Sequence, residues 1–183
     1  MKTTTAPSSR RQQAGVTLIE SAITASLAGV VVGIAAPSFE QARERQHLEG
    51  AAAQLETDIL HSRGLAVLRN QGVRISFDSA GGASCYVIHT GAAGECRCAA
   101  DGAAVCSGSA EALRSVRYGA ETPLTLSSNS RSIVFDPVKG TVTPTATVQL
   151  QARSGVAIHQ VVNVMGRVRS CTPSAALAGY RRC

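Results

Sequence analysis

Residues 15–41 read GVTLIESAITASLAGVVVGIAAPSFEQ, and this stretch decides the fold. Between Ser21 and Phe39 it has 19 residues without a charge, which is close to the length that spans the hydrocarbon core of a bilayer. The segment before it is polar and contains Lys2, Arg10 and Arg11 but no acid. A basic flank predicts that this end stays in the cytoplasm while the rest of the chain crosses the membrane.

Two features separate this segment from an ordinary secretory signal. An ordinary signal has a shorter apolar core that ends at an A-x-A-like cleavage site. Here the apolar run continues without a break into a polar helical pattern. Glu20 also lies inside the run, where an unpaired carboxylate costs on the order of 2–3 kcal/mol. Either Glu20 sits in the headgroup region or it has a dedicated partner, and an ordinary single-pass anchor is the alternative interpretation of the segment.

The run from Gly15 to Glu20, together with the basic leader and the uncharged span, resembles the type IV prepilin signature. The resemblance implies that a prepilin peptidase cuts after Gly15 and methylates the new N-terminus at Val16. It also implies that Glu20 neutralises the N-terminal amine of a neighbouring pilin subunit, and that Pro37 lies where pilins often kink this helix. The implied location is the bacterial inner membrane, crossed once, with the domain in the periplasm and later in a pilus or pseudopilus.

The segment after the apolar run predicts an amphipathic helix. Its small and apolar residues step by three and four along the chain: Leu48, Ala52, Leu55, Ile59, Ser62 and Ala66. This spacing predicts one buried face, and the charged residues, Asp58 and Arg63 among them, are assigned to the other faces. Asn70-Gln71-Gly72 predicts the end of the helix.

The remainder of the chain predicts a β-sheet. The predicted strands are Val73–Asp78, Cys85–Thr90, Leu113–Tyr118, Ser132–Asp136, Val148–Ala152 and Val156–Met165. Ser79–Gly82 predicts a hairpin between the first two strands, and Gly91–Gly108 predicts a disulfide-stapled loop with no strand. One long helix followed by strands predicts an α+β fold, in which an antiparallel sheet packs on the outer half of the helix.

The 183 residues suffice for one domain with a core. We expect a cleaved leader at 1–15, a transmembrane helix at 16–36, its amphipathic outer half at 37–71, and a periplasmic β-domain with a basic tail at 72–183. Six cysteines all follow the helix: Cys85, Cys96, Cys98, Cys106, Cys171 and Cys183. In an exported protein this number predicts a disulfide framework.

No catalytic or metal motif is present in the sequence. Cys96-x-Cys98 with Cys106 lacks the second matching pair that structural zinc sites usually show. The four histidines are scattered: His47, His61, His89 and His159. The sequence also has no G-x-S-x-G, H-E-x-x-H or P-loop motif. We therefore expect no catalytic activity, no metal and no cofactor, and a membrane-bound enzyme is the weakest alternative class.

The C-terminal half carries a second resemblance. The turn Phe135-Asp136-Pro137-x-x-Gly140 and the run Val164–Cys171 resemble the FimT/GspH group of minor pilins. The FimT branch has a Gly-Arg-x-Arg motif linked with DNA binding in natural transformation, and Gly166, Arg167 and Arg169 match it. The resemblance implies a minor pilin that takes part in pilus assembly and binds DNA non-specifically. The alternative is a GspH-like pseudopilin of a type II secretion system with a structural role only.

The charge distribution agrees with an anionic partner at this end. The formal net charge is +6, and the stretch from Pro137 to Cys183 contains six bases and no acid. In an extended segment Arg167 and Arg169 point to the same side, and Gly166 lets a ligand approach the backbone closely. The alternative is that these arginines form a solvated face or pair with acids on neighbouring subunits.

Arg181 and Arg182 follow a dozen residues later. A Cys171–Cys183 bridge, one of several possible pairings, places them beside the motif and creates one four-arginine patch. Four phosphate contacts predict a log–log salt slope of about −3.6 on duplex DNA. Aromatic residues are scarce, which favours contact with the DNA backbone over base stacking.

Overall fold

The structure is a computed structural model that describes residues 16–80, 82–99, 101–119, 121–122, 124–174 and 177–183. Two compact units make up the chain, Met1–Gln41 and Ala42–Cys183, and the helix α1 (Leu18–Arg69) runs from the first into the second. The predicted leader, including Gly15 of the cleavage site, lies outside the described residues.

The first unit is the N-terminal part of α1. The Thr17 hydroxyl caps the helix by accepting a hydrogen bond from the Glu20 amide at 3.3 Å. All described residues up to Gln41 are exposed, and Pro37 lies within the helix. By length and composition this part of α1 can cross a membrane.

In the second unit, α1 buries the predicted face. Its buried residues are Leu48, Ala52, Leu55, Asp58, Ile59, Ser62 and Ala66. The predicted stripe is thus confirmed, and Asp58 is an addition that the sequence pattern assigned to another face. The helix ends where predicted, because Asn70 adopts a positive φ of 48° and the Gln71 amide donates to the Ala66 carbonyl at 3.1 Å.

Asp58 is buried because distant strands supply its partners. Its carboxylate accepts hydrogen bonds from the Tyr86 hydroxyl at 2.6 Å and the Gln54 amide at 3.1 Å. It also forms a salt bridge with Arg114 Nε at 3.1 Å. A buried carboxylate is tolerated when it is paired and hydrogen-bonded. Burial, and then the bond to Asp58, raise the pKa of Tyr86 far above its usual value.

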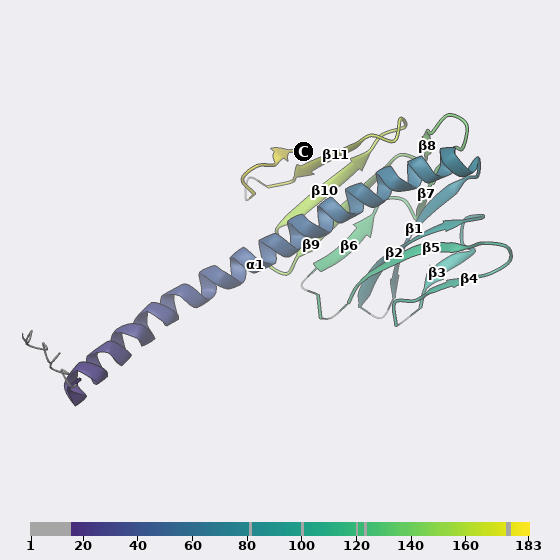
Figure 1. The fold of residues 1–183 in the computed structure, drawn as a ribbon. Coiled ribbons are helices and arrows are strands. Elements are labelled where there is room, and N and C mark those ends of the chain that lie inside the picture. Colours follow the sequence, from purple (N-terminus) through teal and green to yellow (C-terminus); the bar gives the residue numbers. More distant parts are fainter. Residues whose placement is uncertain (1–15, 81, 100, 120, 123, 175–176) are drawn as a thin grey trace, which may run out of the picture. The chain divides into compact units, whose positions relative to one another are not determined.

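The first sheet follows the helix. Its strands are β1 (Val73–Ala80), β2 (Ala83–Thr90), β5 (Ala112–Tyr118), β7 (Ser132–Phe135) and β8 (Val142–Thr143), in the order β5-β2-β1-β7-β8 (Figure 1). All neighbours are antiparallel, and the predicted β1–β2 hairpin is confirmed by the pairing of Ala80 with Ala83. The predicted turn after β7 is present, since the Gly140 amide donates to the Asp136 carbonyl at 2.9 Å.

A small hairpin packs against β2. It is formed by a segment for which the sequence predicted a loop. Its strands are β3 (Cys96–Cys98) and β4 (Ala104–Cys106). The disulfide Cys96–Cys106 joins directly paired residues, and Cys85–Cys98 ties the hairpin to β2. These two links set the register of short strands whose glycine- and alanine-rich sequence resembles a loop.

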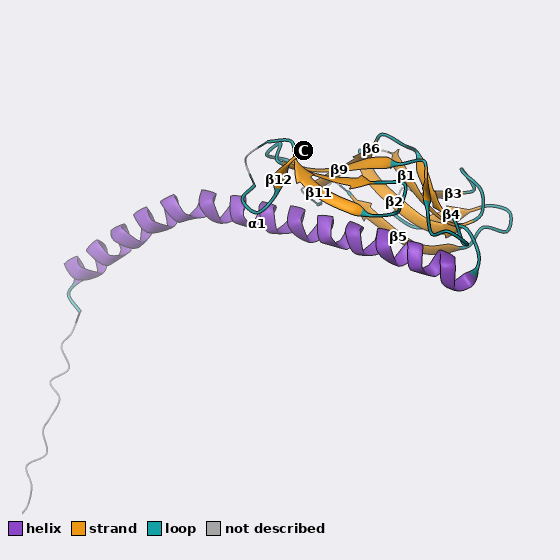
Figure 2. Ribbon diagram, turned by 90° about the horizontal axis from the view of Figure 1, so that it is seen from above, coloured by secondary structure: helices purple, strands orange, loops and turns teal. Residues whose placement is uncertain are grey.

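The second sheet, called the C-terminal sheet below, holds the end of the chain. Its strands are β6 (Leu124–Ser128), β9 (Ala146–Ala152), β10 (Ala157–Val162), β11 (Val168–Thr172) and β12 (Arg181–Arg182), in the order β12-β11-β10-β9-β6. All pairs are antiparallel except β11–β12. The single predicted sheet is therefore two sheets. Both contribute, with the second half of α1, to one hydrophobic core. Figure 2 shows the strands of both sheets on the same side of this half of the helix.

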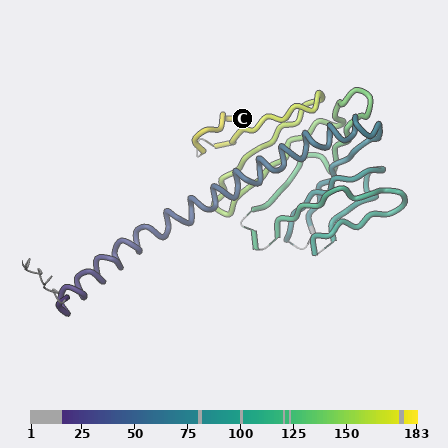
Figure 3. Tube along the Cα trace, in the orientation of Figure 1, coloured from purple at the N-terminus to yellow at the C-terminus, as the bar shows by residue number. Residues whose placement is uncertain are grey.

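The last segment of the chain returns to α1. Figure 3 shows this segment running beside the helix, and the Arg45 guanidinium donates to the Ala178 carbonyl at 2.9 Å. Leu177 is buried in the shared core. This segment brings β12 to the edge of the C-terminal sheet, next to β11.

Candidate nucleic-acid interface

One face of the C-terminal sheet is turned toward α1. Its apolar side chains are buried: Leu126, Val148, Leu150, Ile158 and Val162. Its polar side chains reach the helix. Gln160 Nε2 donates to the Ala52 carbonyl at 3.0 Å, and the Ser170 hydroxyl is 3.2 Å from Glu56 Oε2 and 3.0 Å from Gln160 Oε1. Most of this face is therefore occupied by contacts within the chain.

The opposite face, called the outer face below, follows from the alternation of side chains along strands. It consists of Thr125, Ser127, Thr147, Gln149, Gln151, Ala157, His159, Val161, Arg169, Cys171 and Arg181, of which Ala157 and Cys171 are buried. Apart from Ala157, Val161 and the disulfide-bonded Cys171, these residues are hydroxyl, amide and basic side chains, and none of them is an acid. The outer face is thus neutral at β6 and β9 and basic at β11 and β12.

The predicted strand Val156–Met165 is wrong at its C-terminal end, because a hairpin turn begins after Val162. The Asn163 amide donates to the Arg167 carbonyl at 3.1 Å, and the Gly166 amide donates to the Asn163 carbonyl at 2.9 Å. Gly166 has a φ of 71°, the left-handed conformation that closes a three-residue hairpin loop. Arg167 therefore continues the ladder beyond β11 and lies on the same side as Arg169.

Gly166 has a structural role that differs from the predicted one. A side chain at this position would begin 3.0 Å from Arg63 Cδ and 3.4 Å from the Gly140 carbonyl oxygen. Arg63 is held there, because its Nε donates to that same carbonyl at 2.9 Å. The close approach at Gly166 in this structure is thus made by Arg63 of this chain.

The disulfide Cys171–Cys183 is present and fixes the end of the chain. It is the pairing that the four-arginine patch required. Arg181 is aligned with Cys171 on the neighbouring strand. Arg169 lies two residues before Cys171 on β11, so the disulfide holds Arg181 near Arg169.

Strand alternation assigns Arg182 to the side opposite Arg181, so only three of the four predicted arginines are assigned to the outer face. Arg182 is aligned with the buried Thr172, and its side chain alternates with that of Arg181. It lies on the same side as Tyr180, which packs partly against the core. Burial, and then the carboxylates of Glu49 and Glu56, raise the pKa of Tyr180. The side of Arg182 is therefore the acidic side, next to α1.

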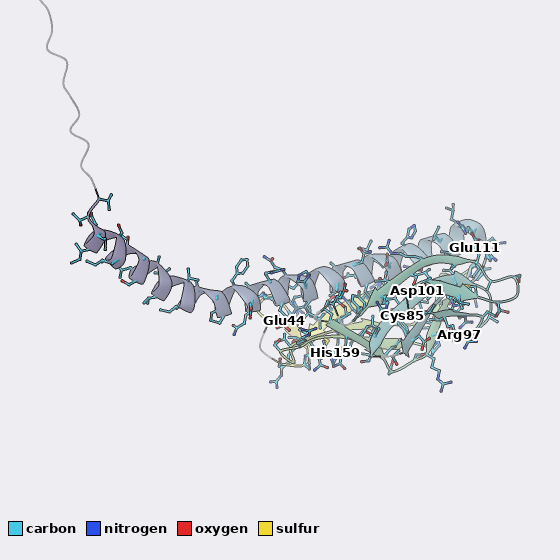
Figure 4. All side chains as sticks on the ribbon, turned by 90° about the horizontal axis from the view of Figure 1, so that it is seen from below. Glu44, Cys85, Arg97, Asp101, Glu111 and His159 are labelled. Atoms are coloured by element: carbon cyan, nitrogen blue, oxygen red, sulfur yellow. A yellow bond between two sulfur atoms is a disulfide. The ribbon has the colours of Figure 1, made fainter. Side chains whose placement is uncertain are left out.

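The lack of a side-chain partner within the chain does not by itself identify an arginine as part of the candidate site. Among the described residues, Arg167, Arg169, Arg181 and Arg182 form no side-chain hydrogen bond or salt bridge, and neither does Arg97 on β3. In Figure 4, Arg97 lies with Cys85 and Asp101 on the β3–β4 side of the domain, away from His159 of the C-terminal sheet. The first three arginines are distinguished by their grouping on an acid-free face.

Sequence reasoning missed the neutral part of this face. Gln149 and Gln151 alternate with buried residues of β9, so the period-two pattern already contained the signal. His159 was set aside as scattered, yet it pairs with Cys171 across the sheet, beside Arg181. Its Nε2 atom is buried and has no hydrogen-bond partner among the described residues.

The remaining predicted site residues lie elsewhere. Val16 is 73% exposed just before α1, and Glu20 is exposed in its first turn. The cysteines form three disulfides, and the part of the chain that the structure describes contains no cluster of three metal-ligating side chains. The geometry thus offers an anion-contacting surface at the C-terminal sheet.

A long N-terminal helix with an exposed apolar part, packed on antiparallel sheets, defines a pilin-like subunit. Residues 51–166, more than half of the chain, match the family described as type II transport protein GspH, and the chain belongs to this family. No curated protein sequence matches the chain. The family match ends at Gly166, so the arginines that follow lie beyond it.

Solved structures with a similar fold include two minor subunits. The crystal structure of the type IV minor pilin FimU of Pseudomonas aeruginosa is 18% identical, with a TM-score of 0.50, over 69% of this chain and 89% of that chain. The minor pseudopilin EpsH from the type 2 secretion system of Vibrio cholerae is 12% identical, with a TM-score of 0.46, over 70% of this chain and 98% of that chain.

Proposed function

We propose that this chain is a minor type IV pilin of the FimT branch, which takes part in pilus assembly and binds DNA non-specifically for uptake in natural transformation. The observation that carries the DNA role is the outer face of the C-terminal sheet. Arg167, Arg169 and Arg181 lie together there, with no acid on that face. The acids of the neighbourhood, Glu49 and Glu56, lie on the α1 side.

The chemistry of this face suits a phosphate backbone. Each guanidinium can donate two parallel hydrogen bonds to a phosphate. Hydroxyl and amide side chains such as Thr147 and Gln149 commonly contact phosphates without reading the sequence. The face carries no aromatic residue for base stacking. Three arginines, instead of the four expected from the sequence, predict a log–log salt slope of about −2.7 on duplex DNA.

The assembly role rests on the family and on the first unit. The exposed apolar part of α1 supports anchoring in the bacterial inner membrane, with the domain in the periplasm. We propose that a prepilin peptidase cuts after Gly15 and methylates Val16. Glu20 then pairs with the N-terminal amine of a neighbouring subunit, which compensates the cost of a carboxylate in the membrane.

A structural pseudopilin is the second candidate function. The matched family is described by type II transport, and its match does not include the arginines after Gly166. In this alternative the chain builds a secretion filament, and the outer face contacts solvent or other subunits. The two candidates share the anchor and the fold, and they differ in what binds the outer face.

A gel-shift titration of the full-length protein in detergent, with its disulfides intact, separates the two. Duplex DNA is titrated at about 50 and about 200 mM salt, a range over which phosphate contacts weaken measurably. We expect salt-sensitive binding that is lost in the Arg167→Gln/Arg169→Gln double variant. Arg97→Gln is the matched control, since it removes an equally unpaired arginine from the β3–β4 side. Equal loss in the control, or no loss in the double variant, favours the structural pseudopilin.

A further inference from the structure

The tip of the β10–β11 hairpin is apolar. Val164 and Met165, its two leading residues, are each 53% exposed. Exposed turns are usually filled by Gly, Asn, Asp, Ser or Pro, which satisfy the backbone or tolerate its conformation. Only Gly166 in this loop follows that rule. Two adjacent apolar side chains at the tip therefore need an explanation outside the turn itself.

The tip is held in place from several sides. Asn163 Oδ1 accepts hydrogen bonds from the amides of Met165 at 3.0 Å and Arg167 at 2.9 Å. The Val142 amide donates to the Val164 carbonyl at 2.8 Å. Gly166 packs against Arg63, as described above. The two side chains are therefore presented on a fixed backbone, so that a ligand would not need to order the loop.

The tip lies directly in front of the arginines. Arg167 is two residues after Met165, and Arg169 follows on the outer face. A ligand that reaches both features offers regularly spaced anions and apolar surface between them. Duplex DNA has both, because phosphates border the grooves and stacked bases lie within. Proteins that bend DNA insert apolar side chains, methionine among them, between base pairs from the minor groove.

We propose that the Val164–Met165 tip acts as a wedge that enters the minor groove and partly separates one base step while Arg167 and Arg169 hold the flanking phosphates. This inference rests on the DNA role proposed above and specifies the form of DNA that is bound. Separating a sound base step costs free energy, whereas a mismatched step is already weakened. The protein therefore prefers duplexes that contain a mismatch.

Another pilin subunit is the competing occupant of this tip. The neighbouring turn exposes Val138 by 79%, and Gly140 of that turn contacts the Arg63 that supports Gly166. A docked subunit covers the valine as well as the hairpin tip, whereas a wedge uses the hairpin alone. Val138→Ser is therefore the matched control for Met165→Ser.

Fluorescence anisotropy of full-length protein in detergent tests the wedge. The two probes are an intact duplex and the same duplex with a central mismatch. We expect the native protein to bind the mismatched duplex about tenfold more tightly, since the unstacking cost is largely absent there. Met165→Ser is expected to bind both duplexes alike and to keep the salt-sensitive binding of the intact one, which also shows that it is folded. Val138→Ser is expected to keep the preference.

Four results overturn the wedge. The first is that the native protein binds both duplexes equally, and the second is that Met165→Ser keeps the preference for the mismatched duplex. The third is that Val138→Ser loses this preference as much as Met165→Ser does, and the fourth is that Met165→Gln keeps the preference. The last variant is close to methionine in shape, so it serves as the test if Met165→Ser does not fold. In each case Arg-dependent binding to the intact duplex leaves the DNA role standing. Absence of binding to either duplex by the native protein contradicts the DNA role itself.

Discussion

The two faces of the C-terminal sheet come from the same strands but differ in what determines their residues. On the inner face, Leu150 and Ile158 are fully buried, and Gln160 is hydrogen-bonded to α1. On the outer face, Gln149 and Arg169 are adjacent in sequence to inner residues; Gln149 is half-buried and Arg169 is exposed. Packing restricts the first set, because a buried side chain must fill its space and satisfy its polar atoms.

This restriction is weaker on the outer face, where most side chains are exposed or half-buried, so its composition is the more informative about function. A soluble surface normally mixes charges of both signs. Here the face has bases at one end, neutral hydrogen-bonding side chains at the other, and no acid. The acids near β12, Glu49 and Glu56, are on the helix side. Changes on the two faces should therefore affect different measurements.

The largest expected effect comes from the inner face. Leu150→Ala should lower the free energy of unfolding by about 2–5 kcal/mol, because a fully buried leucine leaves a cavity. Gln149→Ala, one residue away on the outer face, should change it by no more than about 0.5 kcal/mol. Denaturant unfolding of both variants, with the disulfides intact, measures the contrast. A large loss in Gln149→Ala would mean that the outer face is part of the packed structure.

The next largest effect on stability is expected at Gln160, the buried polar side chain of the inner face. Gln160→Leu should lower the free energy of unfolding by about 1–2 kcal/mol, since it removes the bond to Ala52 and leaves the Ser170 hydroxyl with one partner fewer. Gln151→Leu on the outer face is the control and should be nearly neutral. If Gln160→Leu is also neutral or stabilising, the contacts between the inner face and α1 rest on apolar packing alone.

The first sheet extends the comparison, because both faces of β2 are covered. His89 is fully buried there, with Nε2 2.8 Å from the Ser76 hydroxyl and Nδ1 2.8 Å from the Thr90 carbonyl. The carbonyl can only accept, so Nδ1 carries the proton in the neutral ring. Burial lowers the pKa of His89 most, and Arg74 lowers it further, while the Thr90 carbonyl and Glu95 oppose this.

A lowered pKa fixes the sign of the pH dependence. The unfolded chain takes up a proton at His89 below about pH 6.5, before the folded chain does. The stabilising contribution is therefore present above that pH and is lost as the pH falls through it, at no more than about 1.4 kcal/mol per pH unit. Unfolding measured from pH 7 to 5.5 should show this slope in the native protein and a shallower one in His89→Gln. Equal slopes would show that His89 does not control this range.

The sequence predicted correctly those elements that depend on residues close together in the chain. The buried stripe of α1 follows from side chains three and four residues apart, and Asn70 ends the helix as expected. Asp58 was misassigned because its partners, Tyr86 and Arg114, come from strands far along the chain. A spacing rule that treats a carboxylate as exposed cannot include partners that only the tertiary structure supplies.

The same distinction applies to the candidate site. The Gly-Arg-x-Arg motif could be read from the sequence, but the hairpin that its glycine closes could not. Val164 and Met165 are apolar, so the sequence pattern continued the predicted strand through the turn. The side on which Arg182 lies depends on the parallel pairing of β11 with β12. A two-residue strand in a loop-rich tail carries no periodic signal, so only the structure separates Arg181 from Arg182.

That separation gives the smallest and most specific expected effect. Arg181→Gln should weaken DNA binding about threefold to tenfold and make the log–log salt slope shallower by about 0.9, as expected for the loss of one phosphate contact. Arg182→Gln removes the same charge from the adjacent residue, but on the side of Glu49 and Glu56. It should leave the slope unchanged. Salt titrations of both variants by anisotropy provide the measurement, and a thermal unfolding scan checks that the Cys171–Cys183 segment stays folded. Equal changes in slope would indicate that DNA senses the net charge of the tail and not the outer face, whereas a change only in Arg181→Gln would locate the contact on that face.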